Sequence, residues 1–294
     1  MQRSTSKVFN YLNNMDYEVD MATLIEVINA DTGYRISPQT DLEIVRAIGK
    51  NDNPYTSGDS GVQIQPTLLD QSGELTEFGR DINDNLIDTI RIHSSGFSED
   101  VRIWGQTISD GKFSKMFTQD ATFNGANDVT LTTPLARAWK AEPLGSSDWV
   151  RGVYIYESGI TFDSDGYTDD VDKIHLANKY FPGDNGYSVN SATRCSYTVP
   201  DGHMMVIRKT GISMLRSGNG QAIDGELQIR EYGKSFLTKL IVTRSNAGNV
   251  YGKNHYLYAP SNSDIRMFSH VTNSSSVEIA GQITGFLVPI LETS

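Results

Sequence analysis

From about Asn85 to its end, this sequence is a succession of short segments in which apolar and polar residues alternate. A period of two is that of a β-strand with one buried face. Clusters of Gly, Asn, Asp and Ser interrupt the segments at intervals of about ten residues, as turns between strands do. This spacing is typical of a β-sandwich or jelly roll. We therefore predict a mainly β protein with one or two antiparallel, jelly-roll-like sandwich domains.

The clearest hairpin lies in "GELQIREYGKSFLTKLIVT". Leu227 and Ile229 alternate with polar residues before a turn at 232–234, and Leu240 and Val242 share a face of the returning strand. The last segment of the chain has the same period and is expected to be covered on one side by a facing sheet. The apolar residues expected on one face of this strand are Val277, Ile279, Ile283 and Leu287.

The tetrapeptide "PDGH" combines an acid and a histidine, so it invites a catalytic interpretation. Pro200, however, cannot donate to a β-ladder, and Asp201 and Gly202 are turn residues. His203 then begins another apolar segment. We predict a corner between two strands here, with no catalytic residue.

The first fifty residues have a different pattern, with apolar residues three and four positions apart. Two short helices are expected from Val8, Leu12, Leu24, Val27 and Ile28. A third helix is expected at residues 40–49. There Thr40 and Glu43 have the spacing of a capping box, and Gly49 supplies a C-terminal stop.

These patterns divide the chain into a helical segment at 1–50, a first β-region at 51–162 and a C-terminal β-domain at 173–294. Short helices with many polar neighbours form a poor core alone. The apolar residues of the first segment, Val8, Leu12, Leu24, Val27 and Ile28, are therefore candidates for an interface with another subunit. The alternative is that they pack on their own β-domain.

Charge and length exclude several classes of partner. The net charge of -11 comes from 36 acidic and 25 basic residues without a long block of one sign, which disfavours nucleic acid and anionic membranes. No apolar run reaches the roughly 18 residues that a membrane helix needs, and the start of the chain lacks the apolar region of a secretion signal. We expect no membrane insertion and folding in a cytoplasm.

The residues that carry common enzyme chemistry are not arranged in known motifs. The histidines have no zinc-ligand spacing, and no serine lies in a G-x-S-x-G elbow. The single cysteine, Cys195, excludes an intrachain disulfide and a multi-cysteine zinc site. "GKS" at 233–235 lacks the first glycine of a phosphate loop and is predicted to be a turn. We expect a protein without catalytic residues or cofactors.

Two binding alternatives stay open. The stretch "DSDGYTDDVD" offers Asp163, Asp165, Asp169 and Asp172 as oxygen ligands for calcium, but we favour a solvated loop between domains as its interpretation. Tryptophans on a sandwich face could stack on sugars, as in a carbohydrate-binding, host-receptor-binding or, less readily, glycan-depolymerising module. The tryptophans concerned are Trp104, Trp139 and Trp149.

Two short motifs in the C-terminal part give a family likeness. "TVPDG" contains Thr198, Val199, Pro200 and Gly202, and "GFL" is Gly285, Phe286 and Leu287. Together with the strands around them, they resemble virion structural proteins of tailed bacteriophages, in which a "TVP-x-G" turn precedes strands and a closing "G-[FY]-L" segment.

This resemblance implies a β-sandwich building block of a phage particle, in a head decoration, a tail or a host-contacting appendage. It implies assembly in the host cytoplasm, with the chain itself and other virion proteins as partners and a host-surface glycan as a further candidate. It carries over no catalytic residue.

Overall fold

The computed structural model describes residues 35–36, 43–52, 86–92, 98–145, 153–162, 174–178, 192–193, 196–216, 222–245, 248–251, 257–271 and 278–291. These residues form antiparallel β-strands joined by turns, which confirms the predicted mainly β fold. Within these ranges, no helix is long and apolar enough to span a bilayer.

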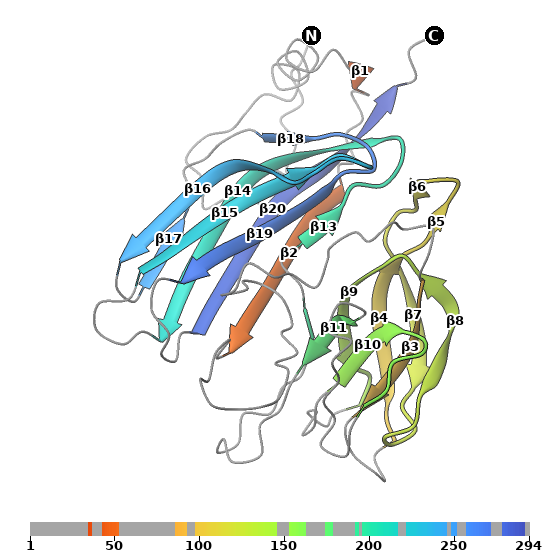
Figure 1. The fold of residues 1–294 in the computed structure, drawn as a ribbon. Coiled ribbons are helices and arrows are strands. Elements are labelled where there is room, and N and C mark those ends of the chain that lie inside the picture. Colours follow the sequence, from red (N-terminus) through yellow and green to blue (C-terminus); the bar gives the residue numbers. More distant parts are fainter. Residues whose placement is uncertain are drawn as a thin grey trace.

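A first sandwich consists of two four-stranded sheets (Figure 1). One has the order β11-β10-β3-β8, and the other has the order β12-β9-β4-β7. The strands of the first sheet are β3 (Ile87–Ile92), β8 (Val129–Leu135), β10 (Val153–Glu157) and β11 (Ile174–Asn178). Those of the second are β4 (Asp100–Gln106), β7 (Phe117–Thr122), β9 (Arg137–Pro143) and β12 (Ala192–Thr193).

Apolar residues of both sheets are buried between them. Ile87 and Ile90 from one sheet and Val101 and Ile103 from the other are fully buried in one apolar cluster. Between β4 and β7 the chain forms a small hairpin of β5 (Ile108–Ser109) and β6 (Lys112–Phe113). This hairpin lies at the end of the first sandwich that faces the second (Figure 1).

The second sandwich is built from longer strands. One sheet has the order β1-β20-β14-β17, with β2 also on β20 and β18 also on β14, and the other has the order β13-β19-β15-β16. The first comprises β1 (Arg35–Ile36), β2 (Glu43–Asp52), β14 (His203–Arg216), β17 (Gly248–Tyr251), β18 (Leu257–Ala259) and β20 (Glu278–Leu291). The second comprises β13 (Ser196–Thr198), β15 (Ala222–Arg230), β16 (Leu237–Ser245) and β19 (Asp264–Val271).

The core of the second sandwich includes Ile283 and Leu287, which the sequence pattern predicts to lie on the same face of a strand. Their neighbours Phe286 and Val288 are also buried, at 0% and 1% exposure. Strand β20 lies between β14 and β2 in the sheet. Ile283 and Leu287 are on one face of this strand and Phe286 and Val288 are on the other, so this part of β20 is buried on both faces rather than covered on one side as predicted. The predicted hairpin at 227–242 is confirmed as β15 and β16.

The helix predicted at residues 40–49 is wrong for its described part, because residues 43–52 form strand β2. This strand pairs with β20 along its whole length, from Glu43 opposite Leu287 to Asp52 opposite Glu278. The segment contains the β-branched residues Ile44, Val45 and Ile48, which favour an extended backbone. Pairing with a central strand outweighs the local capping signal.

Sheet membership does not follow the boundaries expected near residues 50 and 173. β2 belongs to the second sandwich, whereas β11 and β12 belong to the first. The described strands of the first sandwich therefore all lie between residues 87 and 193, whereas the second sandwich combines β1 and β2 with strands between residues 196 and 291.

Candidate functional site

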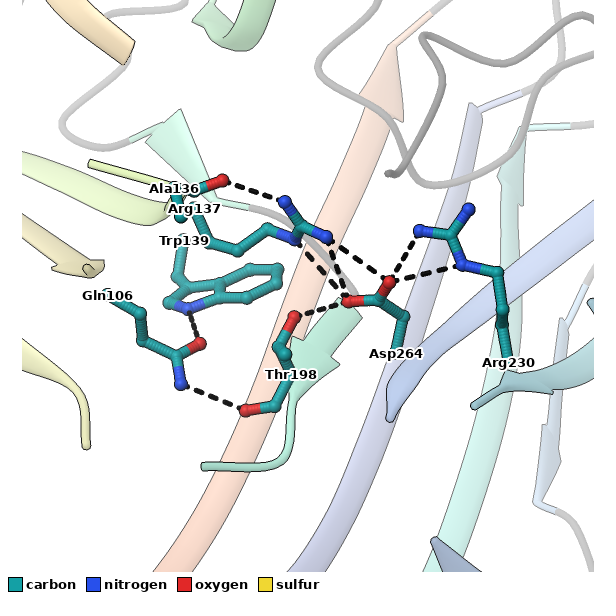
Figure 2. A network of polar contacts seen from close by, with 7 residues as sticks. All are labelled: Gln106, Ala136, Arg137, Trp139, Thr198, Arg230 and Asp264. Carbon is teal, nitrogen blue, oxygen red and sulfur yellow. Dashed lines mark hydrogen bonds and ion pairs between the residues drawn. The ribbon is translucent and has the colours of Figure 1, made fainter. Parts of the chain in front are cut away.

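The best-defined polar site is the junction between the two sandwiches, where charged and amide side chains are buried (Figure 2). Gln106 ends β4 and Arg137 begins β9, both in the first sandwich. Thr198 ends β13, Arg230 ends β15 and Asp264 begins β19, all in the second. The ends of five strands thus converge on one place.

Asp264 is the centre of this junction. Arg137 of the first sandwich donates from Nη2 to both carboxylate oxygens, at 3.3 and 3.2 Å. Arg230 donates to Oδ2 from Nη2 at 2.5 Å and from Nε at 3.2 Å. The Thr198 hydroxyl donates to Oδ1 at 2.5 Å. The side chains of Arg137 and Asp264 are only 3% and 5% exposed, so the ion pair is almost completely removed from water.

Gln106 forms a second connection at the same junction. Its Oε1 accepts a hydrogen bond from Trp139 Nε1 at 2.7 Å, and its Nε2 donates to the carbonyl of Thr198 at 3.0 Å and to that of Ser114 at 2.8 Å. Trp139 also stacks on Tyr197 of the second sandwich, with ring centroids 6.0 Å apart. Trp139 thus orients the Gln106 amide, and the amide nitrogen bonds across the junction to Thr198.

The β5–β6 hairpin makes the third connection. Asp201 N donates to the carbonyl of Phe113 at 2.9 Å, and Phe113 N donates to Asn262 Oδ1 at 3.0 Å. Asn262 Nδ2 in turn donates to Asp201 Oδ1 at 2.8 Å. Asn262 has a φ of 59°, in the left-handed region that asparagine tolerates better than most residues. Its amide thus bridges a turn of each sandwich.

The "PDGH" stretch is confirmed as a turn followed by a strand. Gly202 has a φ of 70°, and its carbonyl accepts a hydrogen bond from Ile290 N at 2.8 Å. His203 begins β14, and its Nδ1 lies 2.8 Å from the backbone carbonyl of Asp201. The histidine contacts the Asp201 backbone, whereas the Asp201 carboxylate bonds to Asn262. The two side chains are therefore not arranged as an acid–base pair.

The polar contacts of the junction attach the two sandwiches to each other. Each polar contact drawn in Figure 2 joins one protein group to another. Buried charges are tolerated when they are paired and hydrogen-bonded, and removing one partner is costly. This arrangement fixes the position of the two sandwiches relative to each other.

Another buried ionisable pair lies in the first sandwich. His175 Nε2 on β11 is 2.8 Å from Glu157 Oε1 on β10, and both side chains are buried. Nearby on β10, the Tyr156 hydroxyl donates to Asp128 at 2.5 Å. Burial is the larger cause and the bond to the Asp128 carboxylate the smaller one of a pKa of Tyr156 far above its usual value.

Among the described residues, no three His, Cys, Asp or Glu side chains lie close enough together to bind a metal ion.

Several predicted site residues lie outside the described residues. These are the calcium candidates Asp163, Asp165, Asp169 and Asp172 and the interface candidates Val8, Leu12, Leu24, Val27 and Ile28. Cys195 and Trp149 lie outside them as well. All of these assignments stay predictions.

The two described tryptophans differ in their availability to a ligand. Trp139 is 5% exposed and is held by Gln106 and Tyr197. Trp104 is half-buried, with Lys140 Nζ 4.5 Å from its ring centroid.

The "GKS" stretch at 233–235 forms a turn after β15, as predicted. Gly233 has a φ of 70°, and Lys234 N donates a hydrogen bond to the Glu231 carbonyl.

Sequence reasoning missed the junction. Its clearest signal is Arg137, a charged residue between Ala136 and Ala138 in a strand whose neighbours are buried. Its partner Asp264 lies 127 residues further along the chain. The pattern indicates that Arg137 is buried and needs an acidic partner, but it does not indicate which residue that partner is.

Comparisons with known proteins give no family. No family model matches the chain, and no curated protein matches it. Among solved structures, the infectious bursal disease virus VP2 subviral particle matches at 12% identity and a TM-score of 0.19, over 90% of this chain and 77% of that one. The structure of the Gx strain of that virus matches at 10% identity and a TM-score of 0.18, over 92% and 83%. This is a weak likeness to viral capsid protein structures, and at such TM-scores it does not establish a shared fold.

Proposed function

We propose that this protein is a non-enzymatic structural subunit of a tailed-bacteriophage particle. It forms part of the particle exterior, as a head decoration or as a component of the tail or an appendage. Its partners are further copies of the same chain and other virion proteins, with which it assembles in the host cytoplasm. Its activity is to present the surfaces of two firmly joined sandwiches.

The observation that carries this proposal is the buried ion pair of Arg137 with Asp264. A subunit of a symmetric assembly needs surfaces in a fixed relative position, because each contact must close on the next copy. Contacts between domains of one chain are commonly polar and allow relative motion. Here the ion pair, the Gln106 bonds and the β5–β6 hairpin oppose such motion.

The motif residues of the phage resemblance have structural roles that agree with a building block. Thr198 ends β13 and binds Asp264, and Gly202 forms the turn that leads into β14. Gly285 lies opposite Ile207 in the pairing of β20 with β14. A Cβ added at Gly285 would lie 2.4 Å from the Val206 carbonyl oxygen, so only glycine fits there. The motifs maintain the sandwich and its junction.

The proposal is tested on the purified full chain. Size-exclusion chromatography with light scattering should give a discrete oligomer whose amount rises with protein concentration, and negative-stain electron microscopy should show regular particles of that mass. A chain that stays monomeric up to millimolar concentration would overturn the proposal. So would turnover of a small molecule or glycan at an enzyme-like rate of about one per second or more.

A further inference from the structure

The edge strand β16 has the two most exposed large apolar side chains of the described residues. Leu237 is 58% exposed and Ile241 is 63% exposed. Within the described part of the chain, β16 pairs with β15 alone and ends its sheet. An edge strand offers unpaired backbone groups to another strand, and apolar side chains on it favour such pairing.

The edge is held in a defined shape. The ring of Phe236, which precedes β16, lies 3.6 Å from the Arg266 guanidinium and 4.6 Å from that of Arg230. Thr238 donates to Glu226 at 2.5 Å, which anchors the strand to β15. An edge that is ordered before binding loses less conformational entropy when a partner adds to it.

Charge argues for a second copy of this chain as that partner. The whole chain has a net charge of -11, so two copies repel each other over most of their surface. The hairpin turn and β16, residues 231–245, contain one acidic residue, Glu231, and three basic ones, Lys234, Lys239 and Arg244. This segment is therefore a place where two acidic copies can approach without opposing acidic charge.

We propose that a second copy of this chain pairs with β16 in antiparallel orientation, about a two-fold axis at Ile241. Ile241 is the midpoint of the strand Leu237–Ser245, so this register gives the longest overlap of the two strands. It sets Ile241 opposite Ile241 of the second copy and Lys239 opposite Thr243. No like charges are then directly opposite, which would be destabilising.

Lys239 makes the register selective. A two-fold axis at Lys239 would oppose two lysines and pair only residues 237–241. The ladder of β15 and β16 also changes register between Leu227 and Gln228, because Leu240 is followed by Thr238 as the partner. This places a bulge at Lys239, and bulges and lysines on edges limit unwanted pairing. These two features of Lys239 favour the register centred on Ile241 over the register centred on Lys239.

The test uses the full chain with two substitutions at Ile241 and matched controls at Met116, an exposed apolar residue of the first sandwich. Ile241→Lys should raise the dimer dissociation constant by about tenfold or more, measured by sedimentation equilibrium, because it sets two lysines opposite each other. Met116→Lys should leave the constant unchanged. Ile241→Cys should give a disulfide-linked dimer on mild oxidation, to a greater extent than Met116→Cys or the unaltered chain with Cys195.

The inference depends on the proposed function, but the two fail differently. A monomeric unaltered chain overturns both. An oligomeric chain whose association is unaffected by Ile241→Lys, and in which Ile241→Cys gives no more cross-linking than the controls, overturns the β16 interface and leaves the structural-subunit proposal standing. Circular dichroism of every variant establishes that it has folded.

Discussion

Arg137 and Asp264, from different sandwiches, form an ion pair in which Nη2 and Oδ2 are 3.2 Å apart and neither side chain is more than 5% exposed. The pair is buried at the point where the ends of β9 and β19 meet. Because Arg230 and Thr198 bind the same carboxylate, Asp264 neutralises charge and orders three other side chains. Its replacement is the most direct perturbation of the junction.

We expect Asp264→Ala to lower the free energy of unfolding by about 3–5 kcal/mol, because it leaves buried guanidinium charge without its partner. Urea denaturation measures this loss. The matched control is Asp120→Ala, which removes a 2.8 Å ion pair with Arg102 whose side chains are 47% and 43% exposed. Exposed pairs contribute about 1 kcal/mol or less, so equal losses in the two variants would contradict the structural role of Asp264.

Gln106→Ala is expected to uncouple the two sandwiches. It leaves the Trp139 indole N–H and the Thr198 carbonyl without the partners they have in the junction. The cost of each lost buried bond is about 1–3 kcal/mol. Differential scanning calorimetry should show one transition for the unaltered chain and two for the variant. A single transition shifted to lower temperature would indicate that the other contacts suffice for coupling.

Gly285→Ala tests the close approach of β20 to β14. The added Cβ would lie 2.4 Å from the Val206 carbonyl oxygen, which is backbone and cannot rotate away. Overpacking of this kind costs about 1–3 kcal/mol. Gly233→Ala is the control, because Gly233 has open space around it and only a φ of 70° to strain the substitution. A smaller loss for Gly285→Ala than for Gly233→Ala would argue against the observed pairing register.

Tyr156 gives a prediction for alkaline pH. Burial and the bond to Asp128 raise its pKa well above its ordinary value of 10.0. The folded state therefore holds the hydroxyl neutral, and this contribution to stability is complete below pH 10 and is lost as the pH rises above it. The stability of the unaltered chain should fall more steeply between pH 10 and 12 than that of Tyr156→Phe. Chemical denaturation at a series of pH values checks this, and parallel curves would contradict it.

The strand pattern was predictable because one-sided burial leaves a period of two in the sequence. "DIRMFSHV" coincides with β19, and the turn at 232–234 joins β15 to β16 as expected. Residues 43–49 were predicted to be helical because their local signals are compatible with both states, and the pairing that decides between them is with β20, more than 200 residues away. No local pattern contains that information.

The candidate site was not predictable for the same reason. Arg137 could be recognised as a charge between two alanines, but Asp264 and Gln106 have nothing in their neighbourhood that indicates burial. Which strand ends meet is decided by how two sandwiches pack. The turn at Asp201 and Gly202 and the strand that begins at His203 were predicted correctly, because proline and glycine have strong local preferences that do not depend on tertiary context.

The position of β20 between β14 and β2 also has a kinetic consequence. On the ribosome, β2 emerges long before β20, its partner among the described strands, and β14 lacks its longest partner until β20 appears, although β17 and β18 pair with parts of it earlier. All the described strands of the first sandwich, in contrast, have been synthesised by residue 193. We therefore expect the first sandwich to form during translation and the second only after residues 278–291 have left the exit tunnel, with β2 waiting unpaired in the nascent chain.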